Sequence, residues 1–400
     1  MKVIVVGAGI GGLAAAVALK RGGSEVKVFE KSTELKELGA GLGLSPNAMK
    51  ALRMLELESA VTAAGNPLDS GARILTAEGR LLLEISSERL EERFGGATIG
   101  IHRAALKRIL LEAYERAGGE VMPAHEFVGY AEDRNGDRIE VRFVSDASGN
   151  ITEHADLLVG ADGLRSSVRR HVLDDGAPDY AGCVAWRGLV SPCATFLDGY
   201  SGFEIQGRGS QFGLVSLGRD SAYWFFTRNS KLSGSEPPSD NKSAVIEHTE
   251  GWCEPVPSVV RATRPEDIHY DRIYHREPAE RWGEGQVTLL GDAAHPMTPD
   301  LGQGACQAIE DAVVLGRSLA PISETLRAPF EAVSTAVSHY SDERRARTAY
   351  VSQASLRAGR ISRVENPLLL WLRNTTLRMA PKNLLIEAQL KQMEKINTWT

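Results

Sequence analysis

The first thirty residues combine two apolar strand patterns with a helix pattern built from small residues. Lys2 to Val6 is a continuous β-branched run, which is typical of a strand buried on both faces of a sheet. Gly12 to Arg21 places leucine and alanine at helical spacing, and Val26 to Glu30 returns to the strand pattern. Because parallel strands need a crossover of this kind, the pattern predicts a βαβ unit and a parallel sheet.

Further elements follow between residues 45 and 160. A proline just inside its start favours a helix over 45–55, and Gly118-Gly119 ends an amphipathic helix over 102–117. Turn residues predict two hairpins, and a last apolar run predicts another strand of the first sheet. These segments are Ala72–Ile85 around Glu78-Gly79, Val128–Val144 around Asn135-Gly136, and Asp156–Val159.

The pattern changes after residue 181 to short alternating strands, which favours a separate antiparallel sheet. The strands are expected at Val184–Val190, Gly202–Ile205, Phe212–Leu217 and Ala222–Thr227. Two later strands, Ile268–His275 and Gln286–Leu290, are expected to lead back into the first domain.

The last third is predicted to be helical from Gln303 to Lys395, with breaks at Asn366-Pro367 and Pro381. Pro367 to Leu372 is strongly apolar. We expect it to pack against the rest of the protein, and a lipophilic-substrate channel or a weak membrane contact is the alternative.

Composition and charge exclude several classes of protein. The chain of 400 residues carries a net charge of −6 with acids and bases interleaved, so a nucleic-acid partner is not expected. Its four cysteines have neither C-x-x-C spacing nor histidine partners, which argues against zinc, any other metal site and disulfides. The N-terminal apolar run is too short for a signal peptide or membrane span, and a cytoplasmic protein is expected.

The segment from Gly7 to Gly12 matches G-x-G-x-x-G between a strand and a helix. Such glycines permit a tight turn and a close approach of backbone N–H groups to a pyrophosphate at the helix N-terminus. Eighteen residues later, Glu30 ends the second strand, where a carboxylate accepts hydrogen bonds from ribose hydroxyls. The pattern predicts dinucleotide binding but does not choose between NAD and FAD.

Three further segments resemble the group A flavoprotein monooxygenases, which have the p-hydroxybenzoate hydroxylase fold. Gly160 to Arg169 is similar to the family's Asp-Gly motif, and Leu289 to Pro299 is similar to its Gly-Asp motif. Asp300 to Ala312 matches the loop and helix that face the flavin. Among these enzymes the chain looks closest to the hydroxylases of salicylate, hydroxynicotinate, urate and alkyl quinolones.

The resemblance implies an α/β fold with three parts. They are a discontinuous Rossmann-like FAD-binding domain with a parallel sheet, an inserted antiparallel-sheet substrate domain, and a helical C-terminus. The FAD-binding domain is expected over 1–70, 100–180 and 282–345, the substrate domain over 71–99 and 181–281, and the C-terminal helices over 346–400.

The implied reaction is hydroxylation of an aromatic or heteroaromatic small molecule. NAD(P)H reduces FAD, O2 adds to the reduced flavin, and the resulting hydroperoxide transfers its distal oxygen to the substrate. A related FAD-dependent dehydrogenase or oxidase that works without NAD(P)H is the alternative. A monomer or homodimer is expected.

The cofactor residues follow from the motifs and the resemblance. Asp292 is expected to accept hydrogen bonds from ribityl hydroxyls, and Arg103 to reach the phosphate or ribityl region. The remaining predicted contacts to FAD, some shared with the nicotinamide, are Gly7, Gly9, Gly11, Gly12, Glu30, Lys31, Gly43, Val128, Asp162, Gly163, Gly302, Gln303, Gly304 and Ala305.

The catalytic candidates are less sharply defined by the sequence. Tyr223 orients a substrate hydroxyl or packs in the core. Arg187 pairs with an anionic substrate, with the motif around Asp162, or in a structural salt bridge. His295 assists proton transfer or stabilises a turn. The resemblance places the Pro299 carbonyl beside the hydroxylation site. Gln211 stands where urate hydroxylases carry a substrate-binding arginine, which argues against urate. An apolar bicyclic aromatic is favoured over a small benzoate.

Overall fold

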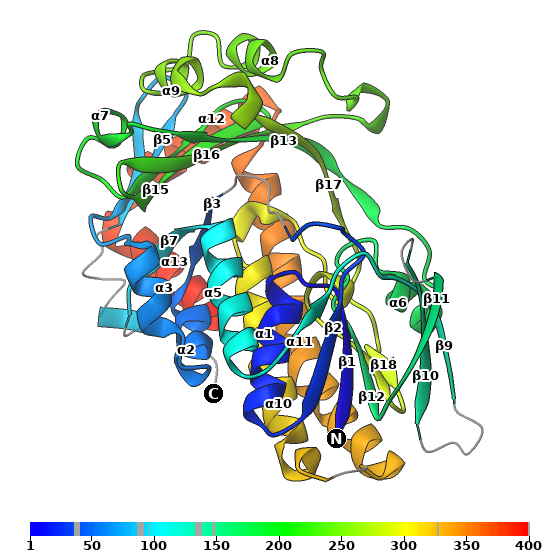
Figure 1. The fold of residues 1–400 in the computed structure, drawn as a ribbon. Coiled ribbons are helices and arrows are strands. Elements are labelled where there is room, and N and C mark those ends of the chain that lie inside the picture. Colours follow the sequence, from blue (N-terminus) through cyan, green and yellow to red (C-terminus); the bar gives the residue numbers. More distant parts are fainter. Residues whose placement is uncertain are drawn as a thin grey trace.

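The N-terminal sheet has six strands in the order β18-β19-β12-β1-β2-β8 (Figure 1). The computed structural model describes residues 1–35, 41–85, 92–94, 96–132, 138–145, 149–325 and 328–398. The pairs among β19, β12, β1, β2 and β8 are parallel, and β18 is antiparallel to β19. The predicted parallel sheet is therefore confirmed. Its strands are β1 (Lys2–Val6), β2 (Glu25–Phe29), β8 (Val121–Met122), β12 (Leu157–Gly160), β18 (Gly283–Glu284) and β19 (Val287–Leu289).

Helices pack beside this sheet around a close contact between α1 and α10. A Cβ atom on Gly316 of α10 would lie 3.0 Å from the Cβ of Ala18 in α1, so the two helices approach closely. The small residues of α1 are buried as the sequence predicts. The helices are α1 (Ile10–Arg21), α2 (Pro46–Met54), α3 (Glu58–Ala64), α5 (Arg103–Arg116), α6 (Ser167–Leu173), α10 (Gly304–Ser323) and α11 (Phe330–Ser362).

Two three-stranded sheets flank the helices. The first, in the order β11-β10-β9, contains the predicted hairpin and a third strand that the pattern did not predict; Asn135-Gly136 lies outside the described residues. The second has the order β3-β7-β4, and its central strand β7 ends directly before α5. Their strands are β9 (Glu126–Glu132), β10 (Ile139–Ser145), β11 (Gly149–Ala155), β3 (Gly41–Leu44), β4 (Asn66–Pro67) and β7 (Ile99–His102).

The second large sheet has seven strands in the order β17-β13-β16-β15-β14-β5-β6 and lies across one end of the first part. All its pairs are antiparallel except β14 with β5, so the predicted antiparallel sheet is confirmed with one parallel pair. The strands are β5 (Ala72–Thr76), β6 (Leu81–Ile85), β13 (Asp179–Val190), β14 (Gly202–Gln206), β15 (Ser210–Gly218), β16 (Ser221–Asn229) and β17 (His269–His275).

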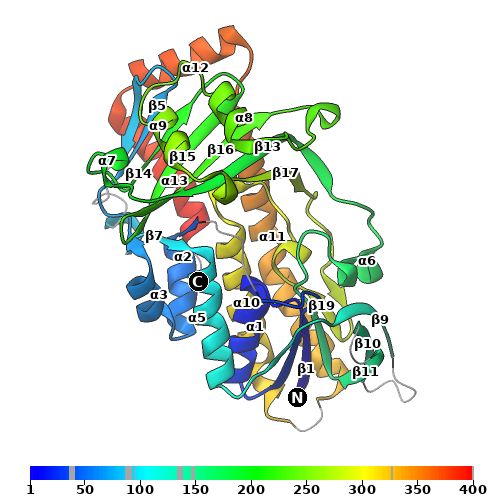
Figure 2. The same ribbon diagram turned by 45° about the horizontal axis from the view of Figure 1, so that its top comes forward.

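Alternation along these strands divides the aromatic side chains between two faces of the sheet. The outer face is covered by α8 (Asn241–His248) and α9 (Val256–Ala262), as Figure 2 shows. Tyr223 and Phe225 occupy the alternate positions of β16, on the inner face toward the first sheet. The aromatic residues that pack under α8 and α9 are Trp186, Phe203, Phe212, Trp224 and Phe226.

The C-terminal helices end the chain as α12 (Pro367–Met379) and α13 (Lys382–Asn397). The predicted breaks at Asn366-Pro367 and Pro381 are confirmed, because both prolines stand at helix starts. The expectation that the apolar run of α12 packs against the rest is wrong, since α12 has no buried residue. The mixed α/β fold with parallel and antiparallel sheets and a helical C-terminus is otherwise as predicted.

Candidate functional site

The turn between β1 and α1 is so tight that three of its glycines have no room for a side chain. A Cβ on Gly12 would lie 1.9 Å from the Gly7 carbonyl oxygen, and one on Gly11 would lie 2.9 Å from the side chain of Leu290. Gly7 has a φ of 105°, and its Cβ would lie 2.4 Å from the Ala161 carbonyl oxygen. Gly7 therefore packs against the Asp-Gly motif, and Gly11 packs against Leu290 of the Gly-Asp motif.

Gly9 has a different reason to be glycine. A Cβ at this position would meet no atom within 4 Å in the part of the chain that the structure describes. Gly9 is also the N-cap of α1, which has no side-chain cap and no acidic residue in its first turn. The helix N-terminus is therefore open to an external anion, and the missing side chain lets that anion come close. A pyrophosphate fits this turn.

Glu30 closes the same turn from the end of β2. Its carboxylate accepts hydrogen bonds from the backbone N–H of Ala8 at 2.8 Å and of Ser32 at 3.0 Å. Burial raises the pKa of Glu30, but these hydrogen bonds outweigh burial and hold the pKa below its ordinary value. Glu30 is thus ionised and keeps lone pairs for a ribose. Lys31 follows it and is exposed.

Asp162 caps the helix α6. Its carboxylate accepts from the Ser166 hydroxyl at 2.5 Å and from the Ser167 backbone N–H at 2.7 Å. Burial raises the pKa of Asp162 despite these bonds. The next residue, Gly163, has a φ of 80° and open space at its Cβ position. The Asp-Gly motif is therefore a rigid turn whose aspartate is occupied within the chain.

Arg169, from the same motif, ties it to the Gly-Asp motif. Its guanidinium is 1% exposed and donates to the carbonyl oxygens of Ala293 at 2.9 Å and Ala294 at 2.7 Å. Its other nitrogens bind the carboxylate of Asp175 at 2.5 and 2.9 Å. The backbone just after Asp292 is therefore fixed by a buried cation.

Asp292 has no hydrogen-bond partner among the described residues, and its side chain is exposed. Surrounding protein nevertheless raises its pKa by desolvation, an effect that His295 and Arg103 oppose. A Cβ on Gly304 would lie 3.7 Å from Asp292 Oδ1. A carboxylate enclosed on several sides, with one open face and free lone pairs, fits a ligand that carries hydroxyl groups.

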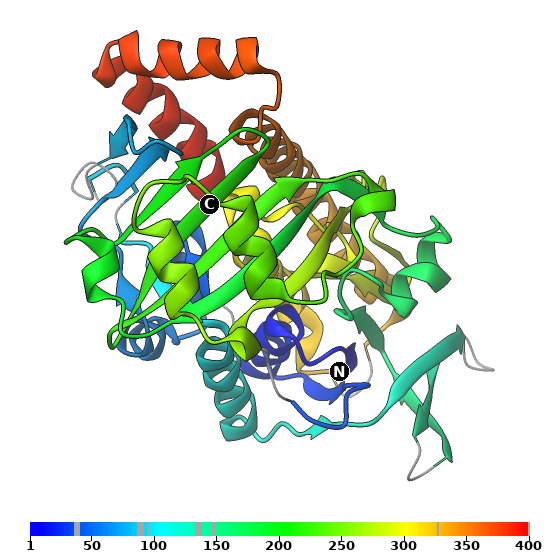
Figure 3. The ribbon, with the colours of Figure 1, turned by 90° about the horizontal axis from the view of Figure 1, so that it is seen from above.

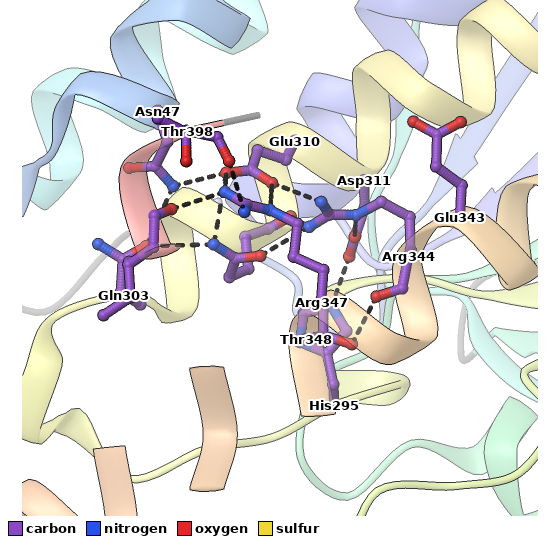
Figure 4. Close-up of polar contacts among 12 residues, drawn as sticks. Asn47, His295, Gln303, Glu310, Asp311, Glu343, Arg344, Arg347, Thr348 and Thr398 are labelled. Atoms are coloured by element: carbon purple, nitrogen blue, oxygen red, sulfur yellow. Dashed lines mark hydrogen bonds and ion pairs between the residues drawn. The ribbon is translucent and has the colours of Figure 1, made fainter. Parts of the chain in front are cut away.

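Behind Asp292 lies a buried ion network, drawn in Figure 4, with Asp311 at one end. Asp311 accepts from Nε2 of His295 at 2.5 Å, from the Gly291 backbone N–H at 3.0 Å and from Nε of Arg344 at 2.6 Å. Burial raises the pKa of Asp311, but His295 and Arg344 outweigh burial and lower the pKa to about 2. His295 and Asp311 therefore hold the turn that carries Asp292.

Glu310 continues the network toward the start of α10. Arg344 donates to Glu310, as does Nε of Arg347 at 2.7 Å. Nδ2 of Asn47 donates to Glu310 at 2.6 Å and to Oε1 of Gln303 at 3.1 Å. Gln303 is 2% exposed and N-caps α10, so the network fixes the start of that helix.

The inner face of the seven-stranded sheet supplies the catalytic candidates. Arg187 pairs with Asp271 at 2.6 Å. Tyr223 is half-buried, and burial raises its pKa, while the charges of Arg187 and Arg103 lower it. A Cβ on Gly41 would lie 2.3 Å from the Tyr223 Cβ, so β3 packs directly on this tyrosine. Tyr223 therefore lies within electrostatic range of Arg103 at the start of α5.

The remaining predicted residues have different surroundings. The Gly43 carbonyl accepts from the Cys306 thiol at 3.6 Å, which joins β3 to α10, whereas the Val128 side chain on β9 is 49% exposed. Pro299 and Gly302 are exposed, and Ala305 is half-buried.

Sequence reasoning assigned no role to the network around Asp311 and Glu310. A signal was present, because two adjacent acids in an otherwise apolar helix are buried only when cations pair with them. Their partners, Arg344 and Arg347, are more than thirty residues away along the chain.

The fold and site define a dinucleotide-binding flavoprotein. Residues 1–355 match the family model described as an FAD binding domain, and the chain belongs to this family. The aurachin C monooxygenase/isomerase of Stigmatella aurantiaca is 36% identical over 380 residues, covering 95% of this chain and 94% of that protein. The 2-heptyl-3-hydroxy-4(1H)-quinolone synthase of Pseudomonas aeruginosa is 30% identical over 391 residues, with coverage of 95% and 94%.

A solved structure gives the same answer for the fold. Klebsiella pneumoniae HpxO complexed with FAD and uric acid superposes with a TM-score of 0.87 at 29% identity, over 99% of this chain and 97% of that one. The predictions of FAD as cofactor and of an FAD-dependent monooxygenase of the aromatic hydroxylase type are confirmed. Among the described residues no helix is long and apolar enough to cross a membrane.

Replacing Gly9 and Gly12 separately tests the glycine turn. Gly12→Ala places a methyl group against the Gly7 carbonyl, so we expect loss of the folded protein. Gly9→Ala meets no neighbour, so we expect an unchanged thermal midpoint and FAD binding weakened about 10-fold or more. Differential scanning fluorimetry and flavin fluorescence titration measure the two effects. Equal damage to folding from both variants would contradict the assignment of Gly9 to the cofactor.

Asp311→Asn tests the ion network through its pH dependence. Asp311 has a folded pKa of about 2 against an ordinary 3.8, so its stabilisation is present above pH 3.8 and is lost as the pH falls toward 2. This ionisation contributes about 2 kcal/mol, which the variant lacks. Urea unfolding at pH 2 to 7 should show a lower stability at neutral pH and a shallower loss in acid for Asp311→Asn. A parallel loss in both proteins would contradict the pairing.

Proposed function

We propose that this protein uses NAD(P)H and O2 to hydroxylate an apolar bicyclic heteroaromatic compound. The observation that carries the proposal is the unpaired carboxylate of Asp292, which lies beside the start of α10 on a turn fixed by Arg169 and Asp311. A monomer or homodimer in the cytoplasm completes the proposal.

The residues present fit FAD along one continuous path. Gly9 and the N-terminus of α1 hold the pyrophosphate, and Glu30 holds the adenosine ribose. Asp292 accepts from the ribityl hydroxyls, with Arg103 beside it. The loop and helix start over 302–305 border the ring system, while Lys31, Gly43, Val128 and Gly163 complete the proposed contacts.

Bound FAD supplies the electron transfer and the reaction with O2. The chain supplies the electrostatics, because the N-terminus of α10 carries a partial positive charge that stabilises negative charge on a flavin ring. Gln303 cannot swing away from this position, since Asn47 and Ser45 bind both ends of its amide at 3.1 Å. The protein also restricts water, which otherwise diverts the oxygen chemistry to hydrogen peroxide.

The inner face of the sheet holds the substrate. Tyr223 donates to or accepts from a polar substituent, and Arg187 tunes the charge there from its pair with Asp271. The exposed Pro299 presents a carbonyl near the same face. We assign His295 a positioning role, because its Nε2 is committed to Asp311. We also retain the proposed division into an FAD-binding domain, a substrate domain and C-terminal helices.

Two observations support a substrate with a quinolone-like ring. The relatives named for aurachin C and for a heptyl quinolone match 95% of this chain. At the sheet, Gln211 donates to Asp300 at 3.3 Å, and Asp300 is also paired with Arg363. Arg363 is therefore already paired with Asp300 and is not free to bind an acidic purine.

Stopped-flow absorbance of the FAD-loaded protein tests the function. Mixing with NADH or NADPH across hydroxybenzoates, hydroxypyridines and quinolones should show that an alkylated quinolone speeds flavin reduction many-fold. Tyr223→Phe should keep the flavin but release more hydrogen peroxide per NAD(P)H oxidised, because the substrate is held less well.

Tyr200→Phe is the matched control, because Tyr200 lies outside the site and binds Glu84. A flavin that responds to neither nicotinamide under any condition would overturn the proposal. The FAD-dependent dehydrogenase or oxidase would then remain.

A further inference from the structure

The outward side of α12 is apolar and uncovered. Leu368 is 69% exposed, Trp371 62%, Leu372 52% and Met379 80%. Leu369, Ile361 at the end of α11 and Leu384 at the start of α13 are also more than half exposed. Contiguous apolar exposure of this kind marks an interaction surface.

The helix is oriented with its polar anchor inward. Arg373 donates to the carbonyl oxygens of Ser362 at 2.7 Å and Ile361 at 2.9 Å, so the side of α12 that carries Arg373 faces the protein. Figure 3 shows α12, in orange-red, standing at the edge of the molecule with one long side free. Trp371 and Leu372 therefore cannot be buried by a small adjustment of the helix.

The surroundings of this apolar side are basic although the whole chain is acidic. Between residues 357 and 382 the sequence has six basic residues and one acid, Glu365. Two of the six, Arg363 and Arg373, are bound to Asp300 and to backbone carbonyls within the protein. Arg357, Arg360 and Arg378 are exposed, and no ion pair involves them in the described part of the chain. The patch thus combines aliphatic side chains, one tryptophan and free arginines.

We propose that this surface, residues 357–384, docks on an anionic lipid bilayer. Leucine and tryptophan enter the acyl and headgroup boundary while arginines contact anionic headgroups, which is the composition of helices that lie in the membrane interface. α12 is far too short to span a bilayer. A second copy of the chain fits this surface less well, because a two-fold contact would bring the same arginines together.

The surface adjoins the inner face of the substrate sheet. The charge of Arg373 acts on Glu204 of β14, and Glu204 shares the inner face with Phe225 through their common partner Gly213. A substrate with an apolar tail concentrates in lipid, so docking would place the membrane beside the edge of the substrate sheet. This delivery step rests on the proposed function, whereas the docking itself does not.

Vesicle co-sedimentation of the FAD-loaded full chain tests the docking without substrate or NAD(P)H. The protein should bind vesicles of phosphatidylglycerol and phosphatidylcholine, with binding that weakens as salt increases, and should bind pure phosphatidylcholine poorly. Replacing Arg357, Arg360 and Arg378 with Gln should weaken binding about 100-fold. The double variant Trp371→Ser/Leu372→Ser should weaken it more than about 10-fold.

Leu232→Ser is the control, because Leu232 is 53% exposed on another part of the molecule. It should bind vesicles like the unaltered protein, and all variants should keep their FAD content and thermal midpoint. Brominated lipids should quench tryptophan emission less in Trp371→Phe.

The docking is wrong if the unaltered protein ignores phosphatidylglycerol vesicles at low salt, or if Trp371→Ser/Leu372→Ser binds as well as the unaltered protein. It is equally wrong if light scattering shows a dimer that this double variant converts to a monomer. If the protein hydroxylates a quinolone in water but does not bind vesicles, the docking proposal fails and the proposed function stands.

Discussion

The ion network of Glu310, Asp311, Arg344 and Arg347 is the constraint on which the site depends. Both acids and Arg344 are fully buried, so removing either the acids or the arginine would leave an unpaired buried charge and destabilise the protein. Asp311 fixes the turn that carries Asp292, and Glu310 fixes the loop at Gln303 through Asn47. One buried cluster therefore fixes both parts of the chain that we propose as the surroundings of the flavin ring.

Local patterns were sufficient to predict the central strands of the first sheet and to find the cofactor motifs, but not the short outer strands β8 and β18. A glycine-rich turn between an apolar strand and a small-residue helix is a local pattern, so Gly7, Gly11 and Gly12 could be recognised from the sequence alone. The antiparallel sheet was also predictable, because its strands alternate. Alternation does not say which side is which, and Tyr223 and Phe225 were assigned to the inner face only when α8 and α9 were seen to cover the other.

The rest depended on contacts between residues far apart in the sequence. Arg344 lies 33 residues from Asp311, on another helix, and no spacing rule connects them. The exposure of α12 was not predicted either, because an apolar helix is normally buried and the sequence does not reveal that its inward side is held by Arg373. Asp162 was predicted to contact the cofactors. The structure adds that its carboxylate accepts a hydrogen bond from the backbone at the start of α6.

The central claim is that this protein inserts one atom of molecular oxygen into its substrate. Mass spectrometry of the product formed from an alkylated quinolone under ¹⁸O2, with NAD(P)H and the FAD-loaded protein, tests this most directly. The account predicts a product heavier by one ¹⁸O atom, and no label from H2¹⁸O under ordinary O2. An unlabelled oxidised product under ¹⁸O2, with all the oxygen recovered as hydrogen peroxide, would contradict it and identify an oxidase.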